Sequence, residues 1–302
     1  MRAIVLHEYG PAKNLLLEEV EEPKPGPGEV LVRIHAAGVN PIDWKIRSGA
    51  MAKMFSIDFP AILGYDMAGT VREVGEDVTG FALGDRVFAR TQHTYAEFTV
   101  VKADELAKVP EGLELTTAAA IPVVATTGDQ LVREQGAVQP GQSVLLTGAL
   151  GSVGRFALFT AIELGAKVIA GVRKKQIDEA LALGATAAID ISDEDQIARL
   201  GSLDAVCDAV GGPLASKLLG HIKPGGIYAS IVGPPHDAAL HPTVQVKAFG
   251  SHADAKAMVH LAEAVRDDKL KLLIGLVLPL DEAAAAHAKG EKGGIGKIVL
   301  AP

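Results

Sequence analysis

A glycine-rich stretch in the middle of the chain carries the residues that point most directly to chemistry. The sequence "VLLTGALGSVGRF" leads from an apolar segment at 144–148 into a segment of helical periodicity that begins at Val153. Glycines at such a junction allow a tight turn and let backbone N–H groups approach an anion at the start of a helix. The stretch predicts a loop that binds the pyrophosphate of a dinucleotide, and a glycine-rich structural turn is the alternative. The residues of this predicted loop, with an alanine where the first glycine of G-x-G-x-x-G would stand, are Ala149, Gly151, Ser152, Val153 and Gly154.

Three consecutive basic residues follow the next apolar segment, "KVIAGV" at 167–172. A site that prefers NAD places Asp or Glu here, against the adenine ribose, whereas this chain has Val172. The cations Arg173, Lys174 and Lys175 would instead attract a 2′-phosphate. Charge-assisted hydrogen bonds of this kind contribute roughly 1.5–3 kcal/mol each. The pattern therefore predicts NADP(H) as the cofactor, and a solvated basic start of a helix is the alternative.

The second half of the chain alternates apolar, strand-like segments with helical ones, which is typical of a parallel sheet covered by helices on both faces. Dinucleotides bind at the carboxyl edge of such a sheet. Gly211 and the pair Val232 and Gly233 end strands at that edge, so we expect them to contact the cofactor. The strands expected from residue 143 onward are 144–148, 167–172, 186–190, 204–210, 227–233 and 245–251.

The first third of the chain has a different sequence pattern, in which short runs rich in β-branched residues are separated by turn signals such as "PKPGPGE" and "FALGD". This pattern predicts a small antiparallel β domain. Residues 116–136 are expected to be helical with a break at Pro122. The last 30 residues return to strand-like texture and are expected to rejoin the first domain. The predicted division is 1–117 with 269–302 for the β domain and 118–268 for the dinucleotide-binding domain.

Composition limits the classes of function that fit the chain. Its 302 residues suggest two domains at roughly 150 residues each. A net charge of −8 argues against a nucleic acid or an anionic membrane as partner. No run approaches the ~20 apolar residues of a membrane helix, and the N-terminus lacks a signal-like core, so a cytoplasmic location is expected. The single cysteine, Cys207, lies in the apolar run "LDAVCDAV" and is expected to be a core residue.

Five blocks in the same order resemble the zinc-free quinone oxidoreductase branch of the medium-chain dehydrogenase/reductase superfamily. The blocks are "GEVLVRIHAAGVNPIDWKIRSG", "ILGYDMAGTVREVGEDVTGFALGDRVFA", "AAAIPVVATTGDQLV", "TGALGSVG" and "GKIVL". The resemblance implies a GroES-like, mainly antiparallel β domain plus a Rossmann domain with a doubly wound parallel sheet. It also implies NADPH-dependent reduction of a quinone or an α,β-unsaturated carbonyl compound, and a homodimer formed through strand 245–251. A chain of this fold that binds NADPH without catalysis is the alternative.

The resemblance also implies that no metal is bound. Zinc-dependent members of the superfamily have Cys at the position of Asn40 and Gly-His-Glu at the position of Gly64, Tyr65 and Asp66. Zinc needs three or four nitrogen or sulfur ligands in a tetrahedral array. The nine histidines of this chain are scattered without paired spacing.

Several site residues follow from the resemblance, each with a structural alternative. Asn40 is expected to donate its amide toward a substrate carbonyl or the nicotinamide ribose, or else to cap the turn before Pro41. Asp43 is expected either to take part in catalysis or to hold the shape of that loop. Lys45 can reach the cofactor or remain a surface lysine, and Thr127 resembles a threonine near the nicotinamide ribose. Tyr65 is expected to offer its hydroxyl to the acceptor oxygen or to pack as a ring. His93 and His252 are expected to be structural.

Overall fold

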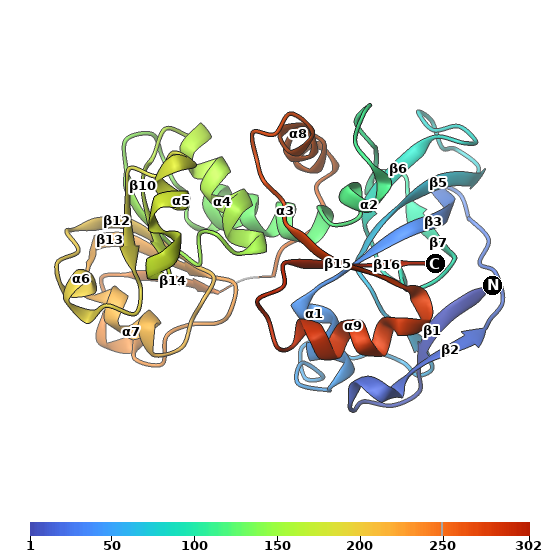
Figure 1. The fold of residues 1–302 in the computed structure, drawn as a ribbon, viewed down its shortest axis with the longest axis horizontal. Helices are drawn as coiled ribbons and strands as arrows, with labels where there is room; N and C mark the ends of the chain where they lie inside the picture. The colour runs from blue at the N-terminus through green and yellow to red at the C-terminus, as the bar shows by residue number, and fades with distance from the viewer. Residues whose placement is uncertain (249) are drawn as a thin grey trace. The chain divides into compact units, whose positions relative to one another are not determined.

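The computed structural model describes residues 1–248 and 250–302, and the chain forms two compact units (Figure 1). One unit comprises Met1–Val123 with Ala253–Pro302, and the other comprises Val124–His252. The C-terminal segment therefore rejoins the first part of the chain, as predicted. The predicted limits at 117/118 and 268/269 lie 6 residues before and 16 residues after the unit boundaries at 123/124 and 252/253, and the domain limits stay a prediction.

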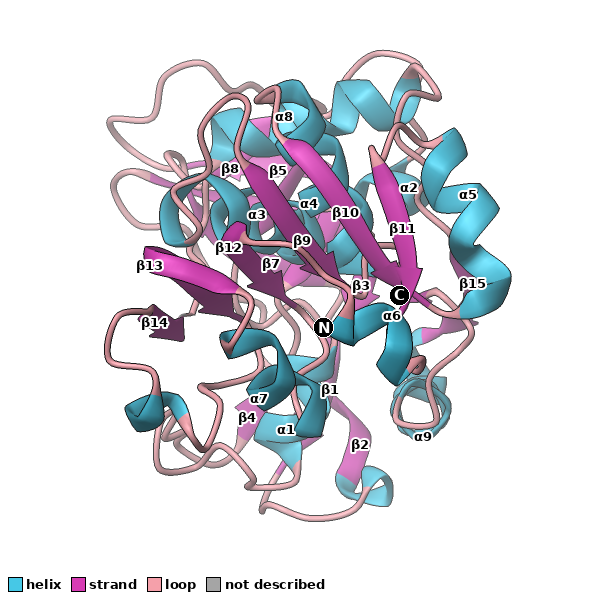
Figure 2. Cartoon of the chain, turned by 90° about the vertical axis from the view of Figure 1, so that its left-hand side faces the viewer, coloured by secondary structure: helices cyan, strands magenta, loops and turns pink. Residues whose placement is uncertain are grey.

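The unit Val124–His252 is built on a six-stranded sheet in the order β11-β10-β9-β12-β13-β14 (Figure 2). Every pair of neighbours in this sheet is parallel, which confirms the doubly wound α/β class. The strands are β9 (Ser143–Thr147), β10 (Lys167–Val172), β11 (Ala187–Asp190), β12 (Leu203–Asp208), β13 (Ile222–Ser230) and β14 (Gln245–Ala248). Of the predicted strand 245–251, residues 245–248 form β14, residue 249 lies outside the described residues, and residues 250–251 are not in a strand.

Helices connect these strands and bury their apolar faces against the sheet. In α4 (Ser152–Glu163), Ala157 and Ala161 are buried in a cluster with Val144 and Leu146 of β9. The helix predicted over 116–136 is divided, because Pro122 opens α3 (Pro122–Gln130), which continues as a π-helical turn at Leu131–Gln135. The remaining helices of this unit are η3 (Lys174–Gln176), α5 (Ile177–Ala182), α6 (Glu194–Ala198), α7 (Pro213–Leu219) and η4 (Ala238–Leu240).

The other unit contains two sheets. Its larger sheet has the order β15-β16-β3-β5-β6-β8, with β7 also paired to β3, and only β15 and β16 run parallel. A three-stranded sheet has the order β2-β1-β4. The strands are β1 (Arg2–Leu6), β2 (Leu15–Glu19), β3 (Glu29–Val39), β4 (Ala61–Ile62), β5 (Asp66–Val74), β6 (Arg86–Arg90), β7 (Phe98–Lys102), β8 (Leu106–Lys108), β15 (Ile274–Pro279) and β16 (Lys297–Ala301). The mainly antiparallel β domain predicted for this region is confirmed.

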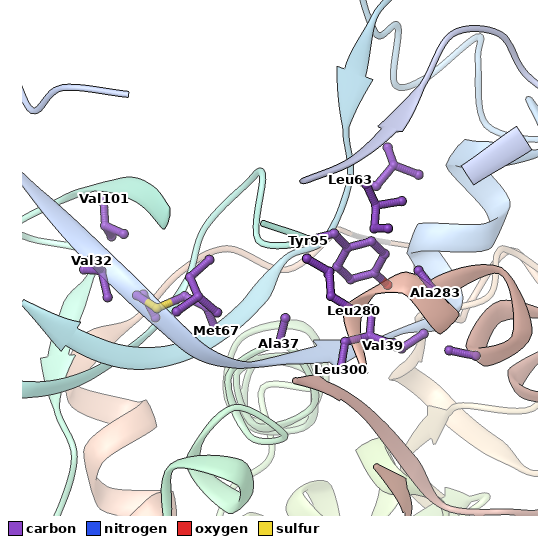
Figure 3. Close-up of a cluster of buried hydrophobic side chains, with 14 of the residues drawn as sticks. Val32, Ala37, Val39, Leu63, Met67, Tyr95, Val101, Leu280, Ala283 and Leu300 are labelled. Atoms are coloured by element: carbon purple, nitrogen blue, oxygen red, sulfur yellow. The ribbon is translucent and has the colours of Figure 1, made fainter. Parts of the chain in front are cut away.

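Short helices flank these sheets. They are η1 (Ala12–Asn14), α1 (Pro41–Arg47), α2 (Leu115–Ala118), α8 (Ala255–Arg266), η5 (Leu280–Glu282) and α9 (Ala283–Gly290). The core of the unit joins apolar side chains of β3, β5 and β16 with those of α9 and the loop before β7 (Figure 3). Tyr95, from that loop, is fully buried in this core together with Leu300. Each fully buried Leu or Val contributes about 1.5–3 kcal/mol, so this core fixes the elements that carry the polar residues described below.

Candidate functional site

The glycine-rich loop after β9 has the geometry of an anion-binding helix start. Gly148 has a φ of +64°, and its N–H donates to the Gly171 carbonyl at 2.9 Å. A Cβ on Gly154 would lie 2.0 Å from the Gly148 carbonyl oxygen, so the close approach of loop and helix requires glycine there. Gly151 is the N-cap of α4, and no side chain caps this helix. The first N–H groups of the helix therefore have no intrahelical acceptor and can bind a phosphate. These groups belong to Ser152, Val153 and Gly154.

The three predicted cations stand at the carboxyl end of β10. Arg173, Lys174 and Lys175 are exposed, and within the described part of the chain none of them forms a salt bridge. Val172, the last residue of β10, pairs with Asp190 of β11. Hydrogen bonds from Ser192 hold the pKa of the Asp190 carboxyl below its usual value, and the nearby Lys174 contributes to this. The cations therefore remain available to an anion.

Except for Lys45, which lies on α1 of the other unit, the remaining predicted cofactor residues lie in the same unit. Gly211 follows β12 with a φ of +70°, and Gly233 follows β13 with a φ of +120°. The side chain of Val232, between β13 and Gly233, is 44% exposed. Thr127 of α3 is 9% exposed, and its hydroxyl lies 2.7 Å from the Ser251 hydroxyl. Three of these four positions thus lie at the carboxyl edge of the sheet, where the strand order predicts the cofactor.

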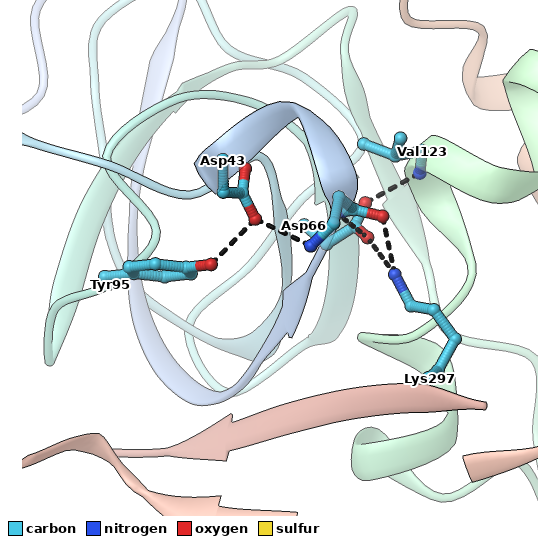
Figure 4. Close-up of polar contacts among 6 residues, drawn as sticks. Asp43, Asp66, Tyr95, Val123 and Lys297 are labelled. Carbon is cyan, nitrogen blue, oxygen red and sulfur yellow. Dashed lines mark hydrogen bonds and ion pairs between the residues drawn. The ribbon is translucent and has the colours of Figure 1, made fainter. Parts of the chain in front are cut away.

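Figure 4 shows a buried polar cluster of the other unit around Asp66 and Lys297, and Asn40 hydrogen-bonds to both of these residues. Its Nδ2 donates to Asp66 Oδ2 at 2.7 Å, and its Oδ1 accepts from Lys297 Nζ at 2.7 Å. Lys297 Nζ also donates to Asp66 Oδ2 at 3.0 Å, and Asp66 Oδ1 accepts from the Val123 N–H at 2.6 Å. Asn40 is 0% exposed and is the N-cap residue of α1. Its amide is thus committed to protein partners in this structure.

Asp43 connects this cluster to a second buried chain of polar groups. Its Oδ2 accepts from the Asn40 backbone N–H and from the Tyr95 hydroxyl, each at 2.7 Å. The Tyr95 oxygen lies 3.1 Å from His287 Nε2, and because the Tyr95 proton goes to Asp43, this contact requires the Nε2–H tautomer. Burial raises the pKa of Asp43 to about 7. Burial, with a contribution from Arg47, lowers the pKa of His287 to about 3.

Tyr65 and Lys45 differ in their surroundings. Tyr65 is half-buried and packs against the core, and burial raises its pKa, with a further contribution from Asp43. Lys45 is exposed on α1. His93 is exposed with a left-handed φ of +61°, and His252 is held by Gln130, whose Oε1 accepts from the His252 backbone N–H at 3.0 Å.

Sequence reasoning missed the partners that hold these residues. Lys297 stands in the block "GKIVL", but nothing in the block indicates that its ammonium is buried with Asn40. Tyr95 and His287 also carry no local signal of their contact, because 192 positions separate them in the sequence. Cys207 is buried, and burial raises the pKa of its thiol to about 12, which confirms it as a core residue.

No group of three or more His, Cys, Asp or Glu side chains among residues 1–248 and 250–302 could hold a metal ion. No helix formed by those residues is both long and apolar enough to span a membrane.

The sheet order and the glycine-rich loop define a dinucleotide-binding fold of the Rossmann type. Comparison with known proteins specifies the family. The model of the alcohol dehydrogenase GroES-like domain matches residues 26–111, and that of the zinc-binding dehydrogenase matches residues 183–300. The chain belongs to the medium-chain dehydrogenase/reductase superfamily and is of the quinone oxidoreductase type.

Two sequence relatives and one solved structure illustrate the similarity. The mitochondrial NAD(P)H oxidoreductase RTN4IP1 of Mus musculus is 31% identical, over 97% of this chain and 87% of that protein. The 2-haloacrylate reductase of a Burkholderia species is 30% identical, over 99% of this chain and 98% of that protein. The structure of the quinone oxidoreductase from Coxiella burnetii superposes with a TM-score of 0.89 at 30% identity, covering 100% of this chain and 99% of that one.

Proposed function

We propose that this protein is an NADPH-dependent reductase that transfers hydride to a quinone or to an α,β-unsaturated carbonyl compound. The observation that carries the cofactor preference is the exposed group Arg173, Lys174 and Lys175 directly after β10. The last residue of β10 is Val172, so this position has no carboxylate. A carboxylate here would accept a hydrogen bond from the 2′-hydroxyl of NADH and would repel the 2′-phosphate of NADPH. The uncapped start of α4 supports binding of the diphosphate in the same unit.

The class of acceptor follows from the relatives. The names of these proteins specify a 2-haloacrylate and a quinone, and both compounds have a carbon–carbon double bond conjugated to a carbonyl or carboxylate group. When bound, the nicotinamide supplies a hydride to such an electron-poor carbon. The negative charge then develops on oxygen, and the protein must provide a hydrogen-bond donor and a proton.

The donor chemistry of Tyr65, Asp66 and Asn40 supports a reaction without a metal. The phenol of Tyr65 has a pKa that burial raises above its usual value near 10, so it is a poor zinc ligand at neutral pH. Both carboxylate oxygens of Asp66 already accept hydrogen bonds, from Asn40 and Lys297 on one side and from Val123 on the other. At the position of Asn40, zinc-dependent members of the superfamily have a cysteine thiolate. This chain has an amide there, which binds zinc weakly.

The three predicted catalytic residues have different roles in this proposal. Tyr65 is half-buried and keeps its proton over the neutral range, so its hydroxyl can donate a hydrogen bond to the acceptor oxygen. Asn40 and Asp43 are 0% exposed and act through the buried cluster that shapes the start of α1. A homodimer through the outer edge of β14 and a cytoplasmic location are further parts of the proposal, and an edge strand suits such pairing.

Steady-state kinetics with both cofactors test the proposed preference. The acceptors are 9,10-phenanthrenequinone and a 2-alkenal, and the metal content is measured on the same sample. In Arg173→Ala, kcat/KM for NADPH should fall about ten- to hundred-fold, because one charge-assisted contact is lost. The value for NADH should stay within about two-fold, because NADH has no 2′-phosphate. Lys167→Ala is the matched control, because Lys167 is an exposed cation at the opposite end of β10.

Three results would contradict the proposal in different ways. Equal kcat/KM values for NADPH and NADH in the natural chain would overturn the cofactor preference. A stoichiometric zinc ion that is needed for turnover would overturn the metal-free reaction. NADPH binding without turnover of either acceptor would favour a non-catalytic NADPH-binding protein of the same fold.

A further inference from the structure

A fully buried carboxylate, Asp208, lies at the carboxyl end of β12 and accepts five hydrogen bonds. Three come from side chains: the Thr147 hydroxyl donates to Oδ1 at 2.5 Å, and the hydroxyls of Tyr228 and Ser230 donate to Oδ2 at 2.7 and 3.1 Å. Within the described part of the chain, no cation is paired with Asp208. A buried carboxylate without a counter-ion is stable only when its oxygens are well supplied with donors.

The five donors come from the two strands that flank β12 and from the turn that follows β12. Thr147 is the last residue of β9, and Tyr228 and Ser230 lie at the end of β13, on the other side of β12. The other two donors are the backbone N–H groups of Val210 and Gly211, which bond Oδ1 at 3.1 and 3.0 Å. Asp208 therefore connects the carboxyl ends of three adjacent strands.

Each of these strand ends leads directly into a loop that we expect to contact the cofactor. Gly148 and the pyrophosphate loop follow Thr147, whose hydroxyl also accepts from the Ala209 N–H at 3.0 Å. The backbone N–H of Gly211 donates a hydrogen bond to Asp208 itself. The N–H of Val232 donates to the Ser230 hydroxyl at 3.1 Å, so the loop after β13 is linked to the same carboxylate through one side chain.

We propose that Asp208 is a positioning residue that holds the starting points of the three cofactor loops in fixed positions relative to one another. This role rests on the proposed cofactor site, because it assigns to the loops the binding of NADPH. Backbone N–H groups bind a phosphate well only when they are fixed before it arrives, and the hydrogen bonds of Asp208 fix the starting point of each loop. The five donors also spread the carboxylate charge, so that a diphosphate near the same edge is not strongly repelled.

Removing the Thr147 hydroxyl tests this role without removing the buried acid. Thr147→Val keeps the shape of the side chain but releases the pyrophosphate loop from Asp208. We expect the Kd for NADPH, measured by fluorescence titration, to rise at least about ten-fold, while the KM for the acceptor changes less than about two-fold. Thr147→Ser restores the hydroxyl and should restore the Kd. Asp208→Asn, which places an N–H group opposite the same donors, should raise the Kd further if the variant folds.

Thr160→Val is the matched control. Thr160 is also buried in this unit, and its hydroxyl donates to another carboxylate, Asp129 Oδ1, at 2.9 Å, but no cofactor loop begins there. Both variants lose a hydroxyl that donates to a carboxylate, and Thr147→Val also leaves the Ala209 N–H without its acceptor, so its Tm should fall further. A purely structural role predicts an unchanged Kd in both variants. An unchanged Kd for NADPH in Thr147→Val, or an equal rise in Thr160→Val, would overturn the proposal.

The same titrations separate this inference from the proposed function. They are run with NADPH and with NADH on the natural chain as well as on the variants. If the natural chain prefers NADH, the proposed cofactor preference fails, and the role of Asp208 is still decided by the change in the Kd for NADH. If the natural chain binds neither cofactor, both proposals fail. If it binds NADPH tightly and Thr147→Val binds it equally well, only the role of Asp208 fails.

Discussion

The pKa values of Asp43 and His287 predict how the free energy of unfolding depends on pH. The two side chains are joined through the Tyr95 hydroxyl, and their pKa values move in opposite directions. The pKa of Asp43 rises from 3.8 to about 7, and that of His287 falls from 6.5 to about 3. Between about pH 4 and 6.5 the folded pair therefore holds one proton, on Asp43. The unfolded chain also holds one proton on these two groups, on His287.

The slope of stability against pH is proportional to the difference in protons bound by the unfolded and folded states. For the intact pair this difference is zero in that window, so the pair contributes no slope. In Asp43→Asn only the unfolded chain holds the proton, and stability should rise with pH by about 1.4 kcal/mol per pH unit relative to the natural chain. In His287→Gln only the folded chain holds it, and stability should fall with pH by about the same amount.

Each of the two groups, taken alone, makes a contribution to stability that changes with pH in the opposite direction to that of the other. The raised pKa of Asp43 gives a contribution that is fully present below pH 3.8 and is lost as pH rises through about 7. The lowered pKa of His287 gives a contribution that is present above pH 6.5 and is lost as pH falls through about 3. The groups that face the pair are Tyr95, Arg47, Asp66 and Lys297, and they are the same in every variant compared.

Urea unfolding at several pH values between 4.5 and 6.5 measures these slopes. Trp44 is the only tryptophan of the chain, and its ring centroid lies 6.2 Å from that of His287, so its fluorescence reports on this unit. The double variant Asp43→Asn with His287→Gln serves as the internal control, because it should return to the slope of the natural chain. Slopes of the same sign in the two single variants, or no change in either, would refute the assignment of protons.

Three further predictions concern other parts of the structure. Lys297→Met leaves the buried carboxylate of Asp66 without its cation and should cost about 3–5 kcal/mol in the free energy of unfolding. Adding Asp66→Asn should recover much of that loss, and an equal loss in the double variant would contradict the ion pair. Gly154→Ala places a methyl group 2.0 Å from the Gly148 carbonyl oxygen, so cofactor binding in a fluorescence titration should weaken at least about ten-fold. Tyr65→Phe should lower kcat for the quinone and leave the Kd for NADPH unchanged, and unchanged kcat would exclude the hydroxyl as a donor.

Local patterns in the sequence were sufficient to predict strand β10, the glycine-rich loop after β9 and the break at Pro122. Strand β10 was predicted at the residues where it is found, because a short apolar run bounded by a glycine and by cations depends little on distant residues. The loop from Ala149 to Gly154 could be predicted for a similar reason, since its glycines are required by the backbone of the loop itself. The division of the helix at Pro122 followed from the missing N–H of proline. These features are determined by neighbours within a few residues.

The polar networks were decided only by the tertiary structure. Lys297 reaches Asn40 across 257 positions of the sequence, and Tyr95 reaches His287 across 192. Asp208 meets Thr147 because β9 and β12 are neighbours in the sheet, although 61 positions separate them. A side chain's burial and its hydrogen-bond partner depend on which elements pack together, and this information is absent from the residues on either side of it. The sequence alone therefore predicted the glycine-rich loop and the cations after β10, and the packed structure decided which polar groups are buried and how they are paired.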